Sequence, residues 1–160
     1  ALFNTDMVGK IMRIRAPLGS CYLREDSTKP MILLATGTGF APIKSIVQSI
    51  LQSKVDRSMV LYWGGRTKAD LYMFEQVEEW ARTYQNFRFV PVISRGDSGG
   101  WMGRKGHVHI AAKEDFPDMS GHQIYACGAA EMVAEARKVL MEERGVQDSD
   151  FFSDAFFPAC

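Results

Sequence analysis

Apolar runs and apolar positions at helical spacing alternate along most of the chain. The first run, residues 31–35, is continuously apolar, as in parallel strands that are buried on both faces. The apolar residues that follow it have the i, i+3, i+4 spacing of an amphipathic helix: Ile43, Ile46, Val47, Ile50 and Leu51. The same pattern predicts four more strands, at 59–63, 87–93, 122–127 and 151–157, and further helices at 71–84, near Ile110 and at 132–140.

This alternation predicts an α/β fold with a doubly wound parallel sheet. Successive β-α-β units cross over in the right-handed sense, so helices cover both faces of such a sheet and ligands bind at the carboxyl ends of its strands. Gly145 follows the last predicted helix, where a residue in the left-handed conformation commonly ends a helix. We therefore expect the chemistry of the chain at the turns that follow the strands.

The first 29 residues do not follow this alternation. Polar and apolar residues alternate at 10–15, an Ala-Pro-Leu-Gly-Ser turn follows, and residues 21–24 have the composition of a second short strand. This pattern is typical of a β-hairpin. We predict a boundary near Lys29, with residues 1–29 forming one unit and residues 30–160 forming the α/β domain.

Charge and cysteine content narrow the possible partners. Nineteen Lys and Arg residues balance nineteen Asp and Glu residues, whereas binding to a phosphate backbone needs a basic excess, so we expect no nucleic acid partner. No apolar run reaches the ~20 residues of a membrane span, so we expect no membrane partner. The three cysteines, Cys21, Cys127 and Cys160, are far apart in the sequence, which argues against a disulfide framework and favours a cytoplasmic location.

Two further patterns do not support a function of their own. Residues 96–100 spell the serine loop of chymotrypsin-like proteases, but every histidine follows this loop and the strand–helix alternation does not fit that fold. The histidines, His107, His109 and His122, lack a carboxylate or thiol at zinc-ligand spacing. We therefore predict neither a hydrolase nor a metal site.

The turn after the first predicted strand has the composition of a phosphate-binding loop. It reads Ala-Thr-Gly-Thr-Gly-Phe-Ala-Pro-Ile and joins a strand to a helix, where backbone N–H groups and the positive helix end face a ligand. Gly37 and Gly39 permit close approach of a pyrophosphate, and Thr36 and Thr38 add hydroxyl groups. Pro42 is tolerated in a first helical turn, but it stands where the G-x-G-x-x-G fingerprint has its third glycine. Taken alone, this segment fits a phosphate site and a plain tight turn equally well.

Four blocks of sequence follow or end predicted strands. They are Thr-Gly-Thr-Gly-Phe-Ala-Pro-Ile at 36–43, Tyr-Trp-Gly-Gly-Arg at 62–66, Tyr-Ala-Cys-Gly at 125–128 and Phe-Ser-Asp-Ala-Phe at 152–156. In this order and spacing they resemble the NAD(P)-binding domain of ferredoxin-NADP reductase-type flavoproteins. Within that family, the last two blocks are most similar to CDP-6-deoxy-glucoseen reductases and related NAD(P)H-flavin reductases. By this resemblance, a ferredoxin reductase-like nucleotide domain follows the β remnant of a flavin-binding barrel.

The resemblance implies a flavin-dependent NAD(P)H oxidoreductase. In such enzymes a hydride passes from NADH or NADPH to FAD, and electrons then pass to an iron-sulphur centre or another acceptor. The family's flavin-binding Arg-x-Tyr-Ser motif and its iron-sulphur cysteine cluster do not occur in this sequence. The chain therefore resembles a partial enzyme whose turnover requires a FAD domain and, where the acceptor is a two-iron two-sulphur cluster, a ferredoxin-like domain.

The resemblance also assigns roles to residues at the ends of strands. The pyrophosphate would lie on the Gly-rich turn, Cys127 and Gly128 would flank the nicotinamide, and Phe156 resembles the family's terminal aromatic that covers the flavin. Cys127 and Phe156 are thus the candidates for catalytic positions. Each has a structural alternative, because a cysteine that ends a buried strand often only packs and the terminal aromatics could simply cap the core.

Three polar residues are candidates for contact with the adenosine half of the nucleotide. Arg66 follows the second predicted strand, and Ser94 and Arg95 follow the third. Ser94 and Arg95 resemble the pair that holds the 2′-phosphate in NADP-using members, where the planar fork of an arginine suits a phosphate. The same dipeptide occurs in NADH-using relatives, so both nucleotides remain open, with NADH slightly favoured.

Two other classes of function fit part of the pattern. The sheet and the phosphate turn alone would equally allow a mononucleotide-binding or regulatory module without a redox role. A protein-interaction domain with a degenerate site is the third class. Cys127, Gly128 and Phe156 favour the redox function, because only that function needs a slot for a flat ring beside a terminal aromatic.

Overall fold

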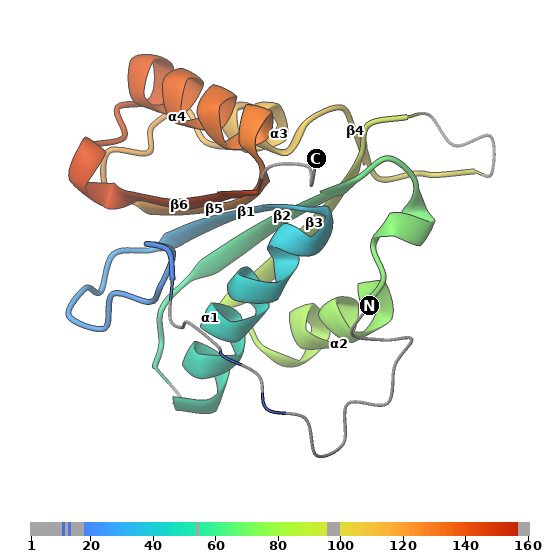
Figure 1. The fold of residues 1–160 in the computed structure, drawn as a ribbon, viewed down its shortest axis with the longest axis horizontal. Helices are drawn as coiled ribbons and strands as arrows, with labels where there is room; N and C mark the ends of the chain where they lie inside the picture. The colour runs from blue at the N-terminus through green and yellow to red at the C-terminus, as the bar shows by residue number, and fades with distance from the viewer. Residues whose placement is uncertain (1–10, 12, 14–17, 54, 96–99, 157–160) are drawn as a thin grey trace.

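The described chain forms a single sheet between two pairs of helices (Figure 1). The computed structural model describes residues 11, 13, 18–53, 55–95 and 100–156. The six strands of the sheet all run parallel, in the order β4-β3-β2-β1-β5-β6. Helices α1 and α2 cover one face of the sheet, and α3 and α4 cover the other. The predicted doubly wound parallel sheet is therefore confirmed.

The element bounds agree with the sequence pattern to within a few residues. The strands are β1 (Met31–Thr36), β2 (Met59–Gly65), β3 (Phe87–Ile93), β4 (Arg104–Lys105), β5 (Gln123–Ala129) and β6 (Phe151–Phe156). The α-helices are α1 (Phe40–Ser53), α2 (Phe74–Thr83), α3 (Val108–Asp115) and α4 (Ala130–Arg144). Short 3-10 turns occur at Gly37–Gly39, Lys68–Asp70 and Asp148–Asp150. Among the described strands and α-helices, β4 is the one that the sequence pattern did not predict.

The continuous apolar run of β1 reflects burial on both sides of the sheet. Leu33 and Ala35 pack in the core under α1 and α2, whereas Ile32 and Leu34 pack in the core under α3 and α4. All four side chains are fully buried. Because burying one such aliphatic side chain contributes about 1.5–3 kcal/mol, the central strand needs apolar residues at successive positions rather than at alternate ones.

Helices α1 and α4 show the features that their sequences predicted. The predicted apolar stripe of α1 is buried against the sheet, from Ile43 to Leu51. Helix α4 ends at Gly145, which adopts the left-handed conformation with φ of 73°, as predicted. None of the described helices is both long and apolar enough to cross a membrane.

The predicted hairpin at the start of the chain is wrong in its described part. Residues 21–24 form no strand. Their backbone donors instead bond side chains of the sheet: Cys21 N donates to Asp154 Oδ2 at 3.3 Å, and Arg24 N donates to the Tyr125 hydroxyl at 3.2 Å. The other predicted strand, 10–15, lies outside the described residues apart from Ile11 and Arg13, neither of which is in a strand.

A buried arginine fastens the segment before β1 to the sheet. The Arg57 guanidinium donates to Lys29 O at 2.6 Å, to Arg24 O at 3.0 Å and to Gln123 Oε1 at 2.6 Å, and the residue is only 3% exposed. Lys29 adds an ion pair with Asp150 at 2.7 Å. The residues just before the predicted boundary therefore pack on the α/β unit, and the boundary near Lys29 stays a prediction.

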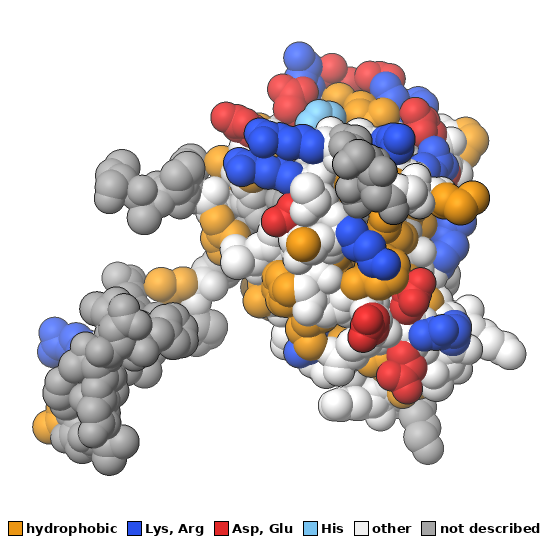
Figure 2. Space-filling view, turned by 90° about the vertical axis from the view of Figure 1, so that its right-hand side faces the viewer, with side chains coloured by type: hydrophobic (Ala, Val, Ile, Leu, Met, Phe, Trp, Pro, Cys, Tyr) orange, Lys and Arg blue, Asp and Glu red, His pale blue; other side chains and the backbone are white. Residues whose placement is uncertain are grey.

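Acidic and basic side chains are mixed on the face that forms the right-hand side of Figure 1. Figure 2 views this face and shows basic side chains in blue and acidic side chains in red interspersed around apolar ones. This distribution agrees with the balanced composition of the chain.

Candidate nucleotide-binding site

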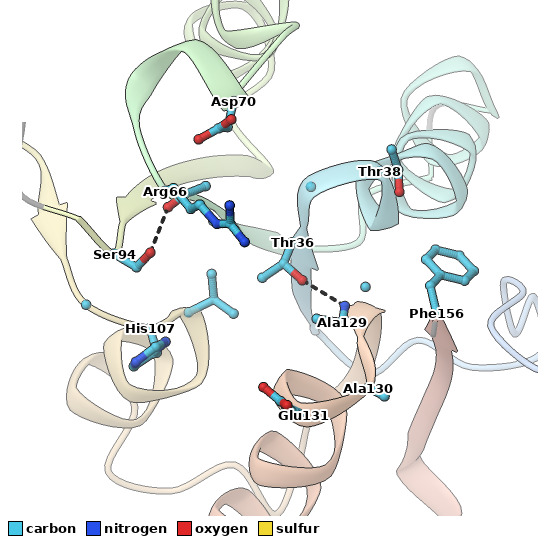
Figure 3. A pocket seen from close by; sticks show the side chains of 16 residues that line it. Thr36, Thr38, Arg66, Asp70, Ser94, His107, Ala129, Ala130, Glu131 and Phe156 are labelled. Atoms are coloured by element: carbon cyan, nitrogen blue, oxygen red, sulfur yellow. Dashed lines mark hydrogen bonds between the residues drawn. The ribbon is translucent and has the colours of Figure 1, made fainter. Parts of the chain in front are cut away.

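A pocket of about 820 Å³ lies at the carboxyl ends of the strands (Figure 3). Turns after the first five strands line it, together with the last residue of β6. The pocket spans the neighbours β1 and β5, whose following helices lie on opposite faces of the sheet. Such a point is where open α/β sheets bind ligands, and the volume suits a small molecule.

Most of the predicted site residues meet in this pocket. The lining includes Thr36, Gly37, Thr38, Arg66, Ser94, Gly128 and Phe156. In Figure 3 the Arg66 side chain points toward the middle of the pocket between Ser94 and Thr36, and Phe156 stands beside Thr38. Phe156 is 44% exposed. The strand ends thus place side chains from distant parts of the sequence around one space.

The turn after β1 leaves backbone open to the pocket. Gly37 has a φ of 52°, and a Cβ added to it would meet no atom within 4 Å. The 3-10 turn that starts there leads directly into α1, so its N–H groups belong to a helix start. Gly106 on the opposite side also faces open space. These two open glycines form a cradle of backbone that a flat or phosphorylated ligand can approach closely.

Two other glycines allow the turns after β1 and β5 to pack closely and form a crevice between them. A Cβ on Gly39 would lie 2.2 Å from Cys127 O, and a Cβ on Gly128 would lie 2.1 Å from Thr36 Oγ1. In addition, Ala129 N donates to Thr36 Oγ1 at 3.1 Å. Gly39 is buried and is not among the lining residues. Its position explains why a side chain is excluded there: the turns after β1 and β5 touch through their backbones.

Two helix starts contribute positive potential to the pocket. Helices α3 and α4 begin at Val108 and Ala130, which both line it. The amino-terminal ends of helices carry positive potential, and Arg66 adds a full positive charge. Two carboxylates, Asp70 and Glu131, also line the pocket. A hydrogen bond from Thr67 N at 2.7 Å lowers the pKa of Asp70.

Two further predicted contact residues, Arg95 and Pro42, also lie outside this lining. Arg95 is exposed, and its backbone N–H donates to Arg66 O at 3.0 Å. Ser94 N similarly donates to Gly65 O at 2.9 Å, so the turns after β2 and β3 are joined. Pro42 lies in the first turn of α1, where it is half-buried. The roles of Arg95 and Pro42 in nucleotide binding stay predictions.

Cys127 is buried in the core and does not line the pocket. Its exposure is 0%, and it packs in the same cluster as Cys21, on the α1 side of the sheet. Contact with the Cys127 thiol and burial raise the pKa of the Cys21 thiol. Buried thiols of this kind are usually inert. As the chain is folded here, Cys127 contributes its backbone to the crevice.

We expect Cys21 and Cys127 to resist modification by a maleimide in the folded chain and to react once the chain is unfolded in urea. The physical reason is burial, which hides both thiols from the reagent and helps to raise the pKa of the Cys21 thiol. The measurement is mass spectrometry of labelled Cys160→Ser protein with and without urea. Rapid labelling of Cys127 in the native chain would show instead that its thiol is open to the pocket.

One part of the pocket wall was not predicted from the sequence. Gly106, His107 and Val108 line the pocket. From the sequence, His107 was considered only as a metal ligand, and no metal site was predicted. They follow the carboxyl end of β4, so the rule that ligands bind after strands applies to them as well. A strand of two residues has too little sequence pattern to be recognised.

Comparison with known proteins agrees with this geometry. Residues 33–138 match the family model of the oxidoreductase NAD-binding domain. The chain belongs to this family. The NAD-binding domain accounts for β1 through most of α4, which includes both turns of the crevice.

Relatives of this NAD-binding domain are reductases. The chain is 39% identical to the CDP-6-deoxy-L-threo-D-glycero-4-hexulose-3-dehydrase reductase of Yersinia pestis, over 99% of this chain and 47% of that protein. It is 36% identical to an NAD(P)H-flavin reductase of Aliivibrio fischeri, over 89% of this chain and 60% of that protein. The chain thus spans about half the length of the curated relatives it matches.

A solved structure supports the same family. The Amycolatopsis cytochrome P450 reductase GcoB superposes with a TM-score of 0.80 and 34% sequence identity, covering 91% of this chain and 44% of that chain. The resemblance to nucleotide domains of ferredoxin reductase-type flavoproteins is therefore confirmed.

Proposed function

We propose that this chain is the nicotinamide-nucleotide-binding domain of a flavin-dependent NAD(P)H reductase. The observation that carries the proposal is the pocket across β1 and β5, where open backbone at Gly37 adjoins an arginine on one side and an aromatic on the other. A dinucleotide has this order of groups: an adenosine, a central pyrophosphate and a flat reducible ring. The pocket supplies a chemical partner for each.

Each part of the lining has a role in this proposal. The turn at Gly37 and Thr38 and the start of α4 bind the pyrophosphate through backbone N–H groups. Arg66 and Ser94 lie toward the adenosine half. Gly128 leaves room for the nicotinamide, and Phe156 covers that end of the pocket. The domain thereby orients the nucleotide and excludes water from one side of it, which makes transfer to a neighbouring flavin an oriented step.

The bound nucleotide supplies a hydride from nicotinamide C4 when a FAD domain is present. Phe156 is the catalytic candidate that the pocket lining supports, because it can touch the ring. Cys127 would need its thiol to leave the core before it could do so. We therefore favour Phe156 for the nicotinamide end and assign Cys127 a supporting position under the Gly39 turn.

The whole enzyme, in this proposal, contains a FAD domain and delivers electrons to an acceptor. The names of the Yersinia and Aliivibrio relatives favour a deoxysugar dehydrase or free flavin as that acceptor. A two-iron two-sulphur cluster on a ferredoxin-like domain would serve as the intermediate carrier where the acceptor takes single electrons. The chain itself then has no turnover until the FAD domain is supplied.

Calorimetric titration with NADH tests the proposal. We expect the chain to bind NADH, and we expect Arg66→Gln to weaken that binding about tenfold, because a charged hydrogen-bond donor near the nucleotide phosphates or ribose is lost. Arg82→Gln is the matched control, since Arg82 lies on α2 with a side chain that is 73% exposed. It should bind as tightly as the unaltered chain.

The results distinguish the competing functions. An absence of NADH binding at millimolar concentration would contradict the proposed function. Binding of 5′-AMP as tight as that of NADH would show that only the adenosine half is recognised, as in a mononucleotide module. Equal loss of NADH binding in both arginine variants would remove Arg66 from the site.

A further inference from the structure

One wall of the pocket makes few backbone hydrogen bonds to the sheet among the described residues. Residues 106–108 form this wall and connect β4 to α3. Within the described part of the chain, β4 is an edge strand of two residues that pairs with β3 at Arg104 and Lys105. After these pairs the chain adds one more backbone hydrogen bond, from Gly106 N to Ile93 O at 2.9 Å. So short a ladder does not by itself fix the position of a wall.

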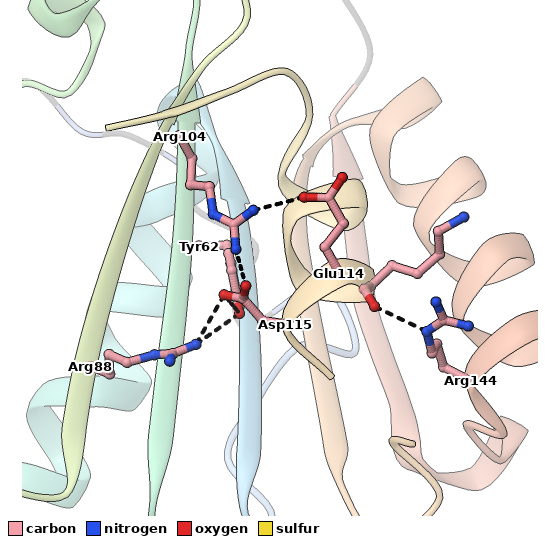
Figure 4. A network of polar contacts seen from close by, with 7 residues as sticks. Tyr62, Arg88, Arg104, Glu114, Asp115 and Arg144 are labelled. Atoms are coloured by element: carbon pink, nitrogen blue, oxygen red, sulfur yellow. Dashed lines mark hydrogen bonds and ion pairs between the residues drawn. The ribbon is translucent and has the colours of Figure 1, made fainter. Parts of the chain in front are cut away.

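A network of side chains joins β4 and α3, the two elements that flank this wall (Figure 4). Asp115, at the carboxyl end of α3, accepts hydrogen bonds from the Tyr62 hydroxyl at 2.8 Å and from Arg88 Nη2 at 3.1 Å. Its other oxygen pairs with Arg104 of β4. Arg104 also bonds Glu114 Oε2 at 2.7 Å. One carboxylate therefore joins α3 to three neighbouring strands, β2, β3 and β4.

The cluster has the properties of a rigid joint. The Asp115 side chain is 18% exposed, so its pairs with two arginines are partly shielded from water. Tyr62 is fully buried, and burial together with its bond to Asp115 raises the pKa of its hydroxyl, which therefore remains a donor. Arg88 Nη2 also donates to the Tyr62 hydroxyl at 3.1 Å, which closes the network.

Asp115 itself is not part of the pocket lining. It stands seven residues after Val108, the first residue of α3, and a helix of this length is about 12 Å long. Because α3 is a rigid element, a shift at its carboxyl end moves its amino-terminal end at the pocket. Loss of the pair with Arg104 would at the same time remove one side-chain attachment of the segment that leads into Gly106.

We propose that Asp115 is a positioning residue for nucleotide binding: through Arg104 and α3 it holds the wall formed by residues 106–108 against the adenosine half of the nucleotide. This inference rests on the proposed function of the pocket. It makes Asp115 a determinant of affinity that never touches the ligand.

Two variants and a control test this proposal on the chain as it is. Asp115→Asn removes the charge from the centre of the network. Arg104→Gln removes the partner on β4, and its side chain is 40% exposed, so this variant has little reason to unfold. Glu143→Gln is the control, because Glu143 also pairs with a residue of α3, Lys113 at 3.1 Å, but does so toward α4 and away from the pocket.

The readout is the dissociation constant for NADH and for 5′-AMP, measured by calorimetry alongside the free energy of unfolding. We expect both Asp115→Asn and Arg104→Gln to weaken the two ligands by the same factor, about fivefold. The double variant should bind the two ligands no more weakly than Asp115→Asn alone, because both changes break the same pair between Arg104 and Asp115. Glu143→Gln should leave both constants unchanged.

The outcomes separate the two hypotheses. If the unaltered chain binds NADH while both variants keep its affinity and only lose stability, the network is merely structural and the positioning role is overturned. Weaker NADH binding with unchanged 5′-AMP binding would overturn the assignment to the adenosine side. If the unaltered chain binds neither ligand, the proposed function fails, and this inference fails with it.

Discussion

Gly39→Ala should lose NADH binding and lower the free energy of unfolding by about 3 kcal/mol. The added Cβ would lie 2.2 Å from Cys127 O and 2.6 Å from Gly128 Cα. Both are backbone atoms of β5, which is paired on both sides, so neither can move aside cheaply. The change therefore separates the turns after β1 and β5, between which the pyrophosphate is proposed to bind.

Gly121→Ala is the matched control for this prediction. A Cβ at Gly121 would meet nothing within 4 Å, and the residue lies in the turn before β5. We expect it to change stability by less than about 0.5 kcal/mol and to leave NADH binding intact. Urea unfolding and NADH titration of both variants make the measurement. A Gly39→Ala chain with normal stability would show that the two turns are less tightly packed than described.

Arg57→Met should destabilise the chain by about 3 kcal/mol or more while leaving the NADH affinity of the folded chain unchanged. The substitution keeps an apolar stem but removes all three hydrogen bonds of the buried guanidinium. Lys29 O, Arg24 O and Gln123 Oε1 would each lose a donor. These groups lie at the amino-terminal ends of the strands, whereas the pocket lies at their carboxyl ends.

Arg82→Met provides the comparison for Arg57. Arg82 is largely exposed on α2, and its ion pair with Glu78 is long, at 3.9 Å. Exposed pairs of this kind contribute about 0–1 kcal/mol, so the control should unfold almost as the unaltered chain does. Equal effects of the two substitutions in urea unfolding would mean that the Arg57 network contributes little to holding the segment before β1.

The parts of the fold that follow from sequence are those with a repeated pattern over many residues. The run at 31–35 predicted a strand buried on both faces, and its side chains do alternate between two cores. The Gly-rich turn was correctly located between β1 and α1 because a strand and a helix flank it. The parallel sheet with helices on both faces followed from the repeated β-α units rather than from any single residue.

The parts that sequence could not predict depend on contacts between distant residues. Nothing near residues 21–24 indicates that Asp154 and Tyr125 take their backbone donors, which removes the need for a partner strand. The two residues of β4 are too few for a pattern. The burial of Cys127 follows from strand alternation, because Tyr125 and Cys127 face the same core. Its position in the same cluster as the free Cys21 could not be predicted without the fold.

The bond between Ala129 N and Thr36 Oγ1 joins positions 93 residues apart. During synthesis, β1 leaves the ribosome long before its second neighbour, β5, exists. Until then β1 has one unpaired, apolar edge, which is the kind of surface on which nascent chains associate wrongly and which chaperones shield. Docking of β5 closes this edge and builds the crevice in the same event, so a nascent chain gains its ligand site only when most of it has been made.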